Sequence, residues 1–143
     1  MKVLFDTNIV LDVLIDRPPF AEAAVALFAA VEHDALRGYL CATTITTVYY
    51  LTARALGPER AGKEVGKLLT MFEVAPVGRP VLESALKSGF ADFENAVVCQ
   101  AACHAGAQAI VTRNLKDFKG AELPVYSAVE LVKILTVRDR PNE

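Results

Sequence analysis

The sequence has little of several features that mark particular classes of protein. Its 15 basic and 17 acidic residues give a formal net charge of −2, which excludes binding to a polyanion through overall positive charge. The longest uncharged apolar run, residues 23–31, is far shorter than the roughly 18 residues that indicate a membrane span. The start of the chain, "MKVLFDTN", lacks the apolar core of a signal peptide. We therefore expect a cytoplasmic protein with no membrane partner.

Cysteine is also sparse. The sequence has three cysteines, Cys41, Cys99 and Cys103, and they form no CxxC motif. This excludes a disulfide framework and a zinc ribbon. Cys99 and Cys103 lie four residues apart beside His104, but no second pair of metal ligands is found elsewhere in the sequence. We therefore interpret the cysteines as reduced thiols buried in the fold.

The rest of the composition is that of a globular domain. The chain has 143 residues, of which 53% are hydrophobic, and this is enough for one domain with a substantial core. We predict a single domain over residues 1–136 and a polar carboxyl-terminal tail over residues 137–143.

Apolar runs with strand character alternate with segments of helical periodicity along the whole chain. Strands are expected at residues 2–5, 38–44, 72–77, 109–112 and 123–127, with a turn at Gly38 and a terminal helix over residues 128–135. This alternation predicts an α/β fold, with a parallel sheet, right-handed crossovers and helices on both faces.

Polar side chains follow two of the expected strands and open one of the helices. Working residues in open α/β sheets lie beyond the carboxyl ends of the strands, so these side chains should meet at one edge. They are Asp6 after the first strand, Asp92, Glu94 and Asn95 at a helix start, and Thr112, Asn114 and Asp117 after the fourth strand.

Several carboxylates at one edge raise one another's pKa values unless a cation offsets their charge. Mg²⁺ or Mn²⁺ suits oxygen ligands, and such an ion activates water for attack on phosphorus, which points to phosphodiester chemistry. Each acid also has a simpler interpretation. Asp6 and Asp92 can be helix N-caps, Glu94 a first-turn acid, and Asp117 a loop acid.

Three stretches, "VLFDTNIVLDVL", "DFENAVVCQAA" and "AIVTRNLKDF", together resemble the signature motifs of PIN domains, particularly toxin-type (VapC-like) ribonucleases. The resemblance implies a three-layer α/β/α sandwich with a central, mostly parallel sheet. It implies a metal-dependent endoribonuclease that hydrolyses single-stranded RNA, commonly the toxin of a type II toxin–antitoxin pair. It also implies an antitoxin partner and a homodimer, for which Tyr49, Tyr50 and helix 21–31 are either contact surface or core.

The resemblance also assigns roles to residues. The catalytic acids would be Asp6, Asp92, Glu94 and Asp117. The ligands of Mg²⁺ or Mn²⁺ would be Asp6, Asp92 and Asn95. The expected substrate contacts are Asn8, Thr112, Arg113, Asn114 and Lys116. The basic residues Arg113, Lys116 and Lys119 are interpreted either as contacts to the RNA backbone or as a solvated basic turn.

The sequence departs from the family pattern at three positions. Thr47 stands where the family has a glutamate, Asn95 where it has an aspartate, and Asn114 where it commonly has another acid. An amide offers an oxygen but no charge. Two hypotheses follow: a nuclease of weakened activity, or a PIN-like module that binds RNA or protein without a working metal site. A third, an aspartyl-phosphate enzyme using Asp6, is disfavoured because Asn8 replaces its second acid.

Overall fold

The computed structural model describes residues 1–138. Within them the chain forms five strands: β1 (Lys2–Phe5), β2 (Arg37–Cys41), β3 (Glu73–Ala75), β4 (Ala109–Val111) and β5 (Val125–Tyr126). The helices are α1 (Thr7–Leu14), α2 (Ala21–Glu32), α3 (Ala42–Leu56), α4 (Pro58–Met71), α5 (Arg79–Lys87), α6 (Phe93–His104) and α7 (Ala128–Arg138). A short 3₁₀ helix, η1 (Leu115–Phe118), precedes β5.

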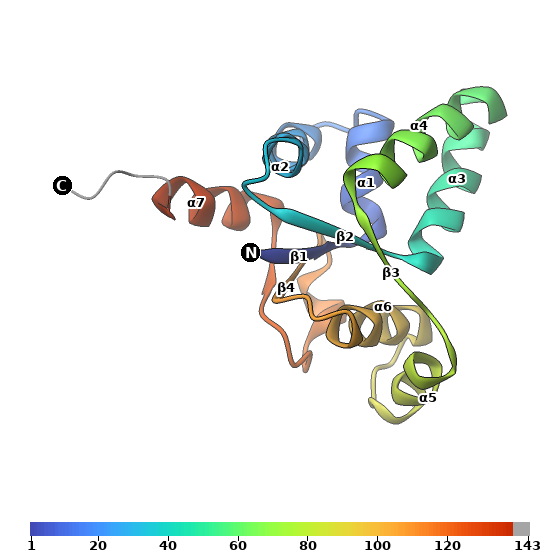
Figure 1. The fold of residues 1–143 in the computed structure, drawn as a ribbon, viewed down its shortest axis with the longest axis vertical. Helices are drawn as coiled ribbons and strands as arrows, with labels where there is room; N and C mark the ends of the chain where they lie inside the picture. Colours follow the sequence, from blue (N-terminus) through green and yellow to red (C-terminus); the bar gives the residue numbers. More distant parts are fainter. Residues whose placement is uncertain (139–143) are drawn as a thin grey trace.

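The strands form one sheet in the order β3-β2-β1-β4-β5, and every neighbouring pair is parallel. Helices α1 to α4 cover one face, together with α7, and α5 and α6 cover the other (Figure 1). The prediction of a three-layer α/β/α sandwich is confirmed. The order of the strands also places the switch point of the sheet between β1 and β4, where working residues are expected.

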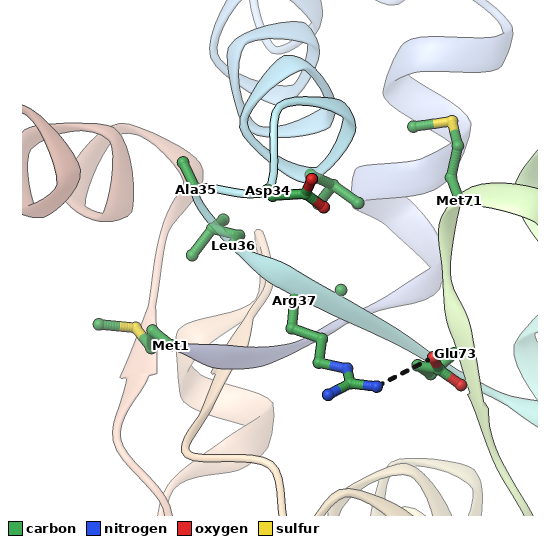
Figure 2. Close-up of a pocket in the computed structure, with 9 residues that line it drawn as sticks. Met1, Asp34, Ala35, Leu36, Arg37, Met71 and Glu73 are labelled. Carbon is green, nitrogen blue, oxygen red and sulfur yellow. Dashed lines mark hydrogen bonds and ion pairs between the residues drawn. The ribbon is translucent and has the colours of Figure 1, made fainter.

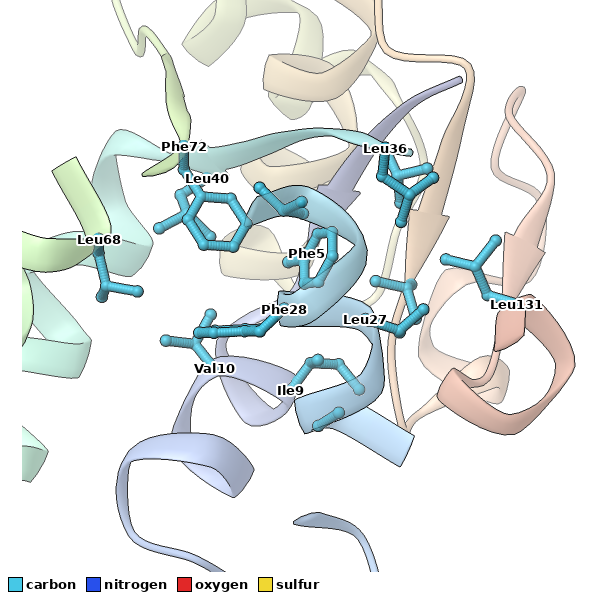
Figure 3. Close-up of a cluster of buried hydrophobic side chains, with 14 of the residues drawn as sticks. Phe5, Ile9, Val10, Leu27, Phe28, Leu36, Leu40, Leu68, Phe72 and Leu131 are labelled. Carbon is cyan, nitrogen blue, oxygen red and sulfur yellow. The ribbon is translucent and has the colours of Figure 1, made fainter. Parts of the chain in front are cut away.

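Each face of the sheet has its own hydrophobic core, because buried parallel strands place apolar side chains on both sides. The larger core lies under α1 to α4 and α7, and Figure 3 shows its aromatic centre. There the rings of Phe5, Phe28 and Phe72 pack edge to face, with centroids 5.1 to 5.9 Å apart. The second core packs α6 against the sheet through small side chains, among them Cys99, Ala101 and Ala102. These two cores fix the position of β1, which carries Asp6 at its end.

Gly38 does not form the predicted turn. It lies inside β2, paired with Val3, and a Cβ there would lie 2.6 Å from ring carbons of Phe72. The glycine is needed for this close approach of the aromatic core to the strand. Strand β2 also ends at Cys41 rather than at residue 44, because Ala42 to Thr44 form the first turn of α3.

Helix α7 begins with a capping box. The Ser127 hydroxyl accepts a hydrogen bond from the backbone N–H of Glu130, and the Glu130 carboxylate accepts one from the N–H of Ser127. These contacts lower the pKa of Glu130. The helix continues to Arg138, three residues beyond its expected end, and the rest of the predicted tail, 139–143, lies outside the described residues. No helix within residues 1–138 is long and apolar enough to cross a membrane.

Candidate active site

The centre of the candidate site is Asp6, which follows β1 at the switch point and is only 7% exposed. Its Oδ1 accepts a hydrogen bond from the backbone N–H of Thr7 at 2.9 Å, so the carboxylate also caps α1. Its Oδ2 accepts one from the hydroxyl of Thr112 at 2.8 Å. Thr112 directly follows β4, so the ends of two neighbouring strands hold the carboxylate in one orientation.

Burial raises the pKa of Asp6, because the charged carboxylate loses hydration. The hydrogen bonds from Thr112 and Thr7 oppose this increase, and the negative charges of Glu94 and Asp117 add to it. Asp6 is therefore a buried acid whose surroundings disfavour its charge. A cation at this position would remove that cost.

A pocket of about 240 Å³ opens over Asp6. It is lined by Asp6, Thr7, Asn8, Leu11, Arg17, Asp92, Glu94, Asn95, Val98, Arg113 and Asn114. We call it the acid pocket, because it is bordered by three carboxylates, one directly after β1 and two at the start of α6. The sequence prediction that these segments meet at one edge of the sheet agrees with this arrangement.

A second pocket of about 200 Å³ adjoins the acid pocket and shares Asp92 and Asn95 with it. Its other charged residues come from η1 and the residue after it: Lys116, Asp117 and Lys119. The predicted site residues are therefore divided between two neighbouring hollows. Asp117 lies in the second one, although its charge still reaches Asp6.

The acids at the start of α6 also have the helix-capping roles of the simpler interpretation. Asp92 is the N-cap, and its Oδ1 accepts a hydrogen bond from the backbone N–H of Asn95 at 2.9 Å. Glu94 is in the first turn, where the helix dipole favours an acid. The Oδ2 atom of Asp92 has no hydrogen-bond partner among residues 1–138. Capping α6 therefore leaves one oxygen of Asp92 available to a ligand.

The substrate-binding residues predicted after β4 have different places in the structure. Asn8, Arg113 and Asn114 line the acid pocket, and the backbone N–H of Arg113 donates to Oδ1 of Asn8. Thr112 does not reach the pocket surface, because its side chain is fully buried against Asp6. Its place is that of a residue that positions the acid, rather than one that contacts substrate.

Thr47, which the resemblance places where a glutamate is expected, does not line either hollow. Its hydroxyl donates to the backbone carbonyl of Thr43 one turn earlier in α3. Thr44 lies closer to the site: its buried hydroxyl is 3.0 Å from that of Thr7. This contact joins the start of α3 to the turn that follows Asp6.

Asp12 and Arg17 are not among the site residues that the sequence predicts. Asp12 is completely buried in α1 and forms ion pairs with Arg17 at 3.0 Å and Arg113 at 3.2 Å. Both arginines line the acid pocket. The five-residue spacing of Asp12 and Arg17 across the end of α1 was the one local signal that could have linked them.

The donor atoms around Asp6 fit a divalent cation that keeps much of its water. Among residues 1–138, no three His, Cys, Asp or Glu side chains are grouped closely enough to hold a metal ion. Mg²⁺ often needs only one or two protein carboxylates, with water completing its coordination. Asp6 and Asp92 supply hard carboxylate oxygens, and Asn95 adds an amide beside them. Asp6 is buried and, among residues 1–138, forms no ion pair with a Lys or Arg side chain, and this observation favours such an ion.

A hollow larger than the acid pocket lies at the opposite ends of the strands (Figure 2). It has a volume of about 400 Å³ and contains Met1, Asp34, Arg37 and Glu73 among its lining residues. Its ion pair, Arg37 with Glu73 at 3.4 Å, is well exposed. This hollow contains no buried acid, and none of the predicted site residues lies there.

Fold and site together define an α/β domain with a buried acid at the switch point of its parallel sheet. The PIN domain family model matches residues 2–116, and the chain belongs to this family. Use of a divalent metal is a general feature of the family.

Individual relatives have diverged far in sequence. Ribonuclease VapC1 of Aquifex aeolicus is 24% identical over 137 residues, which cover 90% of this chain and 92% of that protein. A toxin–antitoxin complex from Klebsiella pneumoniae contains a chain that is 22% identical, with a TM-score of 0.67, covering 88% of this chain and 97% of that one. Mycobacterium tuberculosis VapC20, a toxin that cleaves the sarcin–ricin loop, is 15% identical with a TM-score of 0.61, covering 76% and 86%.

Proposed function

We propose that this chain is a divalent-metal-dependent endoribonuclease that hydrolyses phosphodiester bonds of single-stranded RNA, and the toxin of a type II toxin–antitoxin pair. The observation that carries the proposal is the buried Asp6 carboxylate, at the base of a pocket that it shares with Asp92 and Glu94. Membership of the PIN family and the similarity to Ribonuclease VapC1 support it.

In this proposal Asp6, Asp92 and Asn95 hold Mg²⁺ or Mn²⁺ through their side-chain oxygens. When bound, such an ion lowers the pKa of a water molecule and offsets the charge that develops on the phosphate. Thr7 and Thr112 keep the Asp6 carboxylate in place through their hydrogen bonds. The protein thus presents a fixed acid at the point of reaction and spends no free energy on reorienting it.

Of the remaining acids, Glu94 is proposed to accept a proton and Asp117 to contribute negative charge. Glu94 lines the acid pocket, is exposed, and has no hydrogen-bond partner among residues 1–138, so it can accept a proton from the attacking water. Asp117, in the adjoining hollow, contributes negative charge from the other side. The substrate would be contacted by Asn8, Arg113, Asn114 and Lys116 around the two hollows.

The test is cleavage of single-stranded RNA by the purified chain with Mg²⁺ or Mn²⁺, repeated with excess EDTA and with Asp6→Asn. We expect cleavage that EDTA abolishes and that Asp6→Asn reduces by about 10²-fold or more, the typical cost of removing a central electrostatic contact. Asp34→Asn, at the opposite edge of the sheet, is the control and should cleave normally. Failure of the wild type to cleave RNA with either metal, or full activity of Asp6→Asn, would refute the proposal.

An antitoxin and a second copy of this chain are the proposed protein partners. The similarity to a chain in the Klebsiella toxin–antitoxin complex supports the first. Tyr49 and Tyr50 of α3 are 42% and 61% exposed and offer apolar surface, whereas the inner face of α2 is used by the core. Light scattering tests the dimer, which should have twice the mass of the 15.4 kDa chain. A partner co-expressed from a neighbouring gene should co-purify and suppress cleavage.

A further inference from the structure

Asp12 is an acid that the proposed metal site does not use. It lies in the middle of α1, its side chain is completely buried, and its carboxylate faces two arginines. Nε and one terminal nitrogen of Arg17 both lie 3.0 Å from Oδ1, and Nε of Arg113 lies 3.2 Å from Oδ2. A buried carboxylate requires such pairing, since an isolated charge in the interior is strongly unfavourable. Two cations, however, are more than one acid needs.

The three charges of this cluster sum to +1. Among residues 1–138, neither Arg17 nor Arg113 has another acid within 4.0 Å. Both arginines line the acid pocket, which is otherwise bordered by the carboxylates of Asp6, Asp92 and Glu94. The pocket therefore has an acidic side and a cationic side, and the cationic side is not neutralised by the acidic one.

The two guanidinium groups are held in place before any ligand arrives. Arg17 also donates to the backbone carbonyl of Asn8 at 3.2 Å, and the Arg113 guanidinium lies 4.0 Å from the ring centroid of Phe20. Their side chains are only 36% and 27% exposed, so both are partly desolvated. The terminal nitrogens of Arg113 have no hydrogen-bond partner among residues 1–138. Fixed, partly dehydrated guanidinium groups with unused donors are well suited to bind a phosphate, often through two parallel hydrogen bonds.

We propose that Arg17 and Arg113 form a phosphate-binding wall, positioned by Asp12, which binds a phosphodiester of single-stranded RNA beside the one that is cleaved. This inference rests on the proposed nuclease function, because it names how that substrate is admitted. A polyanion entering a pocket with three carboxylates is repelled unless a cation attracts it, and the chain as a whole carries a net charge of −2. Asp12 acts through the arginines and is a positioning residue.

The experiment measures binding of a fluorescently labelled single-stranded RNA by anisotropy, in EDTA and over a range of salt concentrations. Arg17→Gln and Arg113→Gln should each weaken binding roughly tenfold at low salt, as expected for loss of a charge-assisted hydrogen bond. Each should also reduce the slope of log affinity against log salt by about 0.7, the value for one phosphate contact on a single strand. Arg37→Gln, the same charge change at the opposite edge, is the matched control and should bind as the wild type does.

Asp12→Asn separates positioning from charge. This substitution makes the pocket more positive, so an effect of charge alone would strengthen RNA binding, whereas loss of positioning should weaken it. Because Asp12 is buried, thermal melting is used to check that the Asp12→Asn variant folds. Arg17→Lys serves as a second variant. Arg17→Lys keeps the charge, removes the planar fork and should also bind more weakly. A merely structural role would lower stability without changing the salt slope.

Folded Arg17→Gln and Arg113→Gln variants with wild-type affinity and salt slope would overturn the inference, as would absence of salt-dependent RNA binding by the wild type. Its failure is distinguishable from failure of the proposed function. If the wild type does not cleave RNA with either metal while both arginine variants lose binding, the wall stands and the nuclease assignment fails. If the wild type cleaves and both variants bind normally, the wall fails and the nuclease assignment stands.

Discussion

Hollows of opposite character lie at the amino ends and the carboxyl ends of the parallel strands, which we call the amino edge and the carboxyl edge of the sheet. At the amino edge, the larger hollow has exposed charges, and its Arg37 and Glu73 side chains are 61% and 56% exposed. At the carboxyl edge, the smaller acid pocket contains Asp6, which is 7% exposed and hydrogen-bonded to a hydroxyl and a backbone N–H rather than to a cation.

This difference shows that buried charge, rather than volume, identifies the site. A solvated ion pair such as Arg37 with Glu73 contributes at most about 1 kcal/mol to stability, and it implies no function. A carboxylate that is buried without a cation is a cost to the fold, and such costs are concentrated at functional sites. The carboxyl edge should therefore govern activity, and the amino edge should govern stability alone.

Thr112→Val should produce the largest effect among the substitutions around Asp6. It removes the hydroxyl that donates to Oδ2 of Asp6 while keeping the shape of the side chain. Metal affinity and RNA cleavage should each fall about 10- to 100-fold, the usual cost of losing a group that orients a ligand. Mn²⁺ titration and cleavage rates measure this.

Thr52→Val is the matched control for that experiment. Thr52 is equally buried, but its hydroxyl has no hydrogen-bond partner among residues 1–138 and lies outside the acid pocket. Its replacement should leave activity unchanged and should not lower stability. Wild-type activity in Thr112→Val would show that the orientation of Asp6 does not matter.

Gly38→Ala tests the amino edge. The added methyl group would lie 2.6 Å from the Phe72 ring, which is itself packed against Phe5 and Phe28 and has little room to move. We expect the free energy of unfolding to fall by about 1–3 kcal/mol, as for other overpacked cores. Urea denaturation measures this, and the folded protein should cleave RNA normally.

Gly66→Ala should change the free energy of unfolding in the opposite direction. Gly66 lies inside α4 with nothing within 4 Å of an added Cβ, so the substitution should stabilise the chain by about 0.5–1 kcal/mol. If Gly38→Ala were as stable as the wild type but lost activity, the division of roles between the two edges would be wrong.

Asn95→Asp should give the smallest effect, in the direction of gain. It adds a charge where the resemblance leads us to expect an aspartate, and the backbone N–H that Asp92 caps is unaffected. Metal affinity and cleavage should rise several-fold. Gln100→Glu, an equivalent amide-to-acid change later in α6 and outside both hollows, should change neither. No response to Asn95→Asp would mean that Asn95 lies away from the metal.

Much of this arrangement was predictable because it is local or set by topology. An apolar run ended by Asp6 and a capping acid at Asp92 are visible in a few consecutive residues. The parallel sheet then brings the ends of β1 and β4 together by geometry alone. Both Asp6 and Asp92 turned out to cap helices and to border the pocket, so the simpler and the functional interpretations were not exclusive.

The parts that could not be predicted depend on contacts between distant residues. Arg113 meets Asp12 only after α1 and the turn following β4 are packed together, and no local pattern encodes that ion pair. The burial of Thr112 against Asp6 and the contact of Gly38 with Phe72 likewise arise from packing. For this reason Gly38, which the sequence predicts as a turn, is a strand residue.

The most direct test of the central claim is a calorimetric titration of the chain with Mn²⁺, compared with Asp6→Asn. Burial raises the pKa of Asp6 above its unfolded value, so the folded state loses stability as pH rises and this carboxyl ionises. Asp6→Asn removes the charge, so the variant should melt no lower than the wild type at neutral pH. We expect saturable binding by the wild type and none by this folded variant. Absence of binding at millimolar Mn²⁺, or identical binding by both proteins, would contradict it.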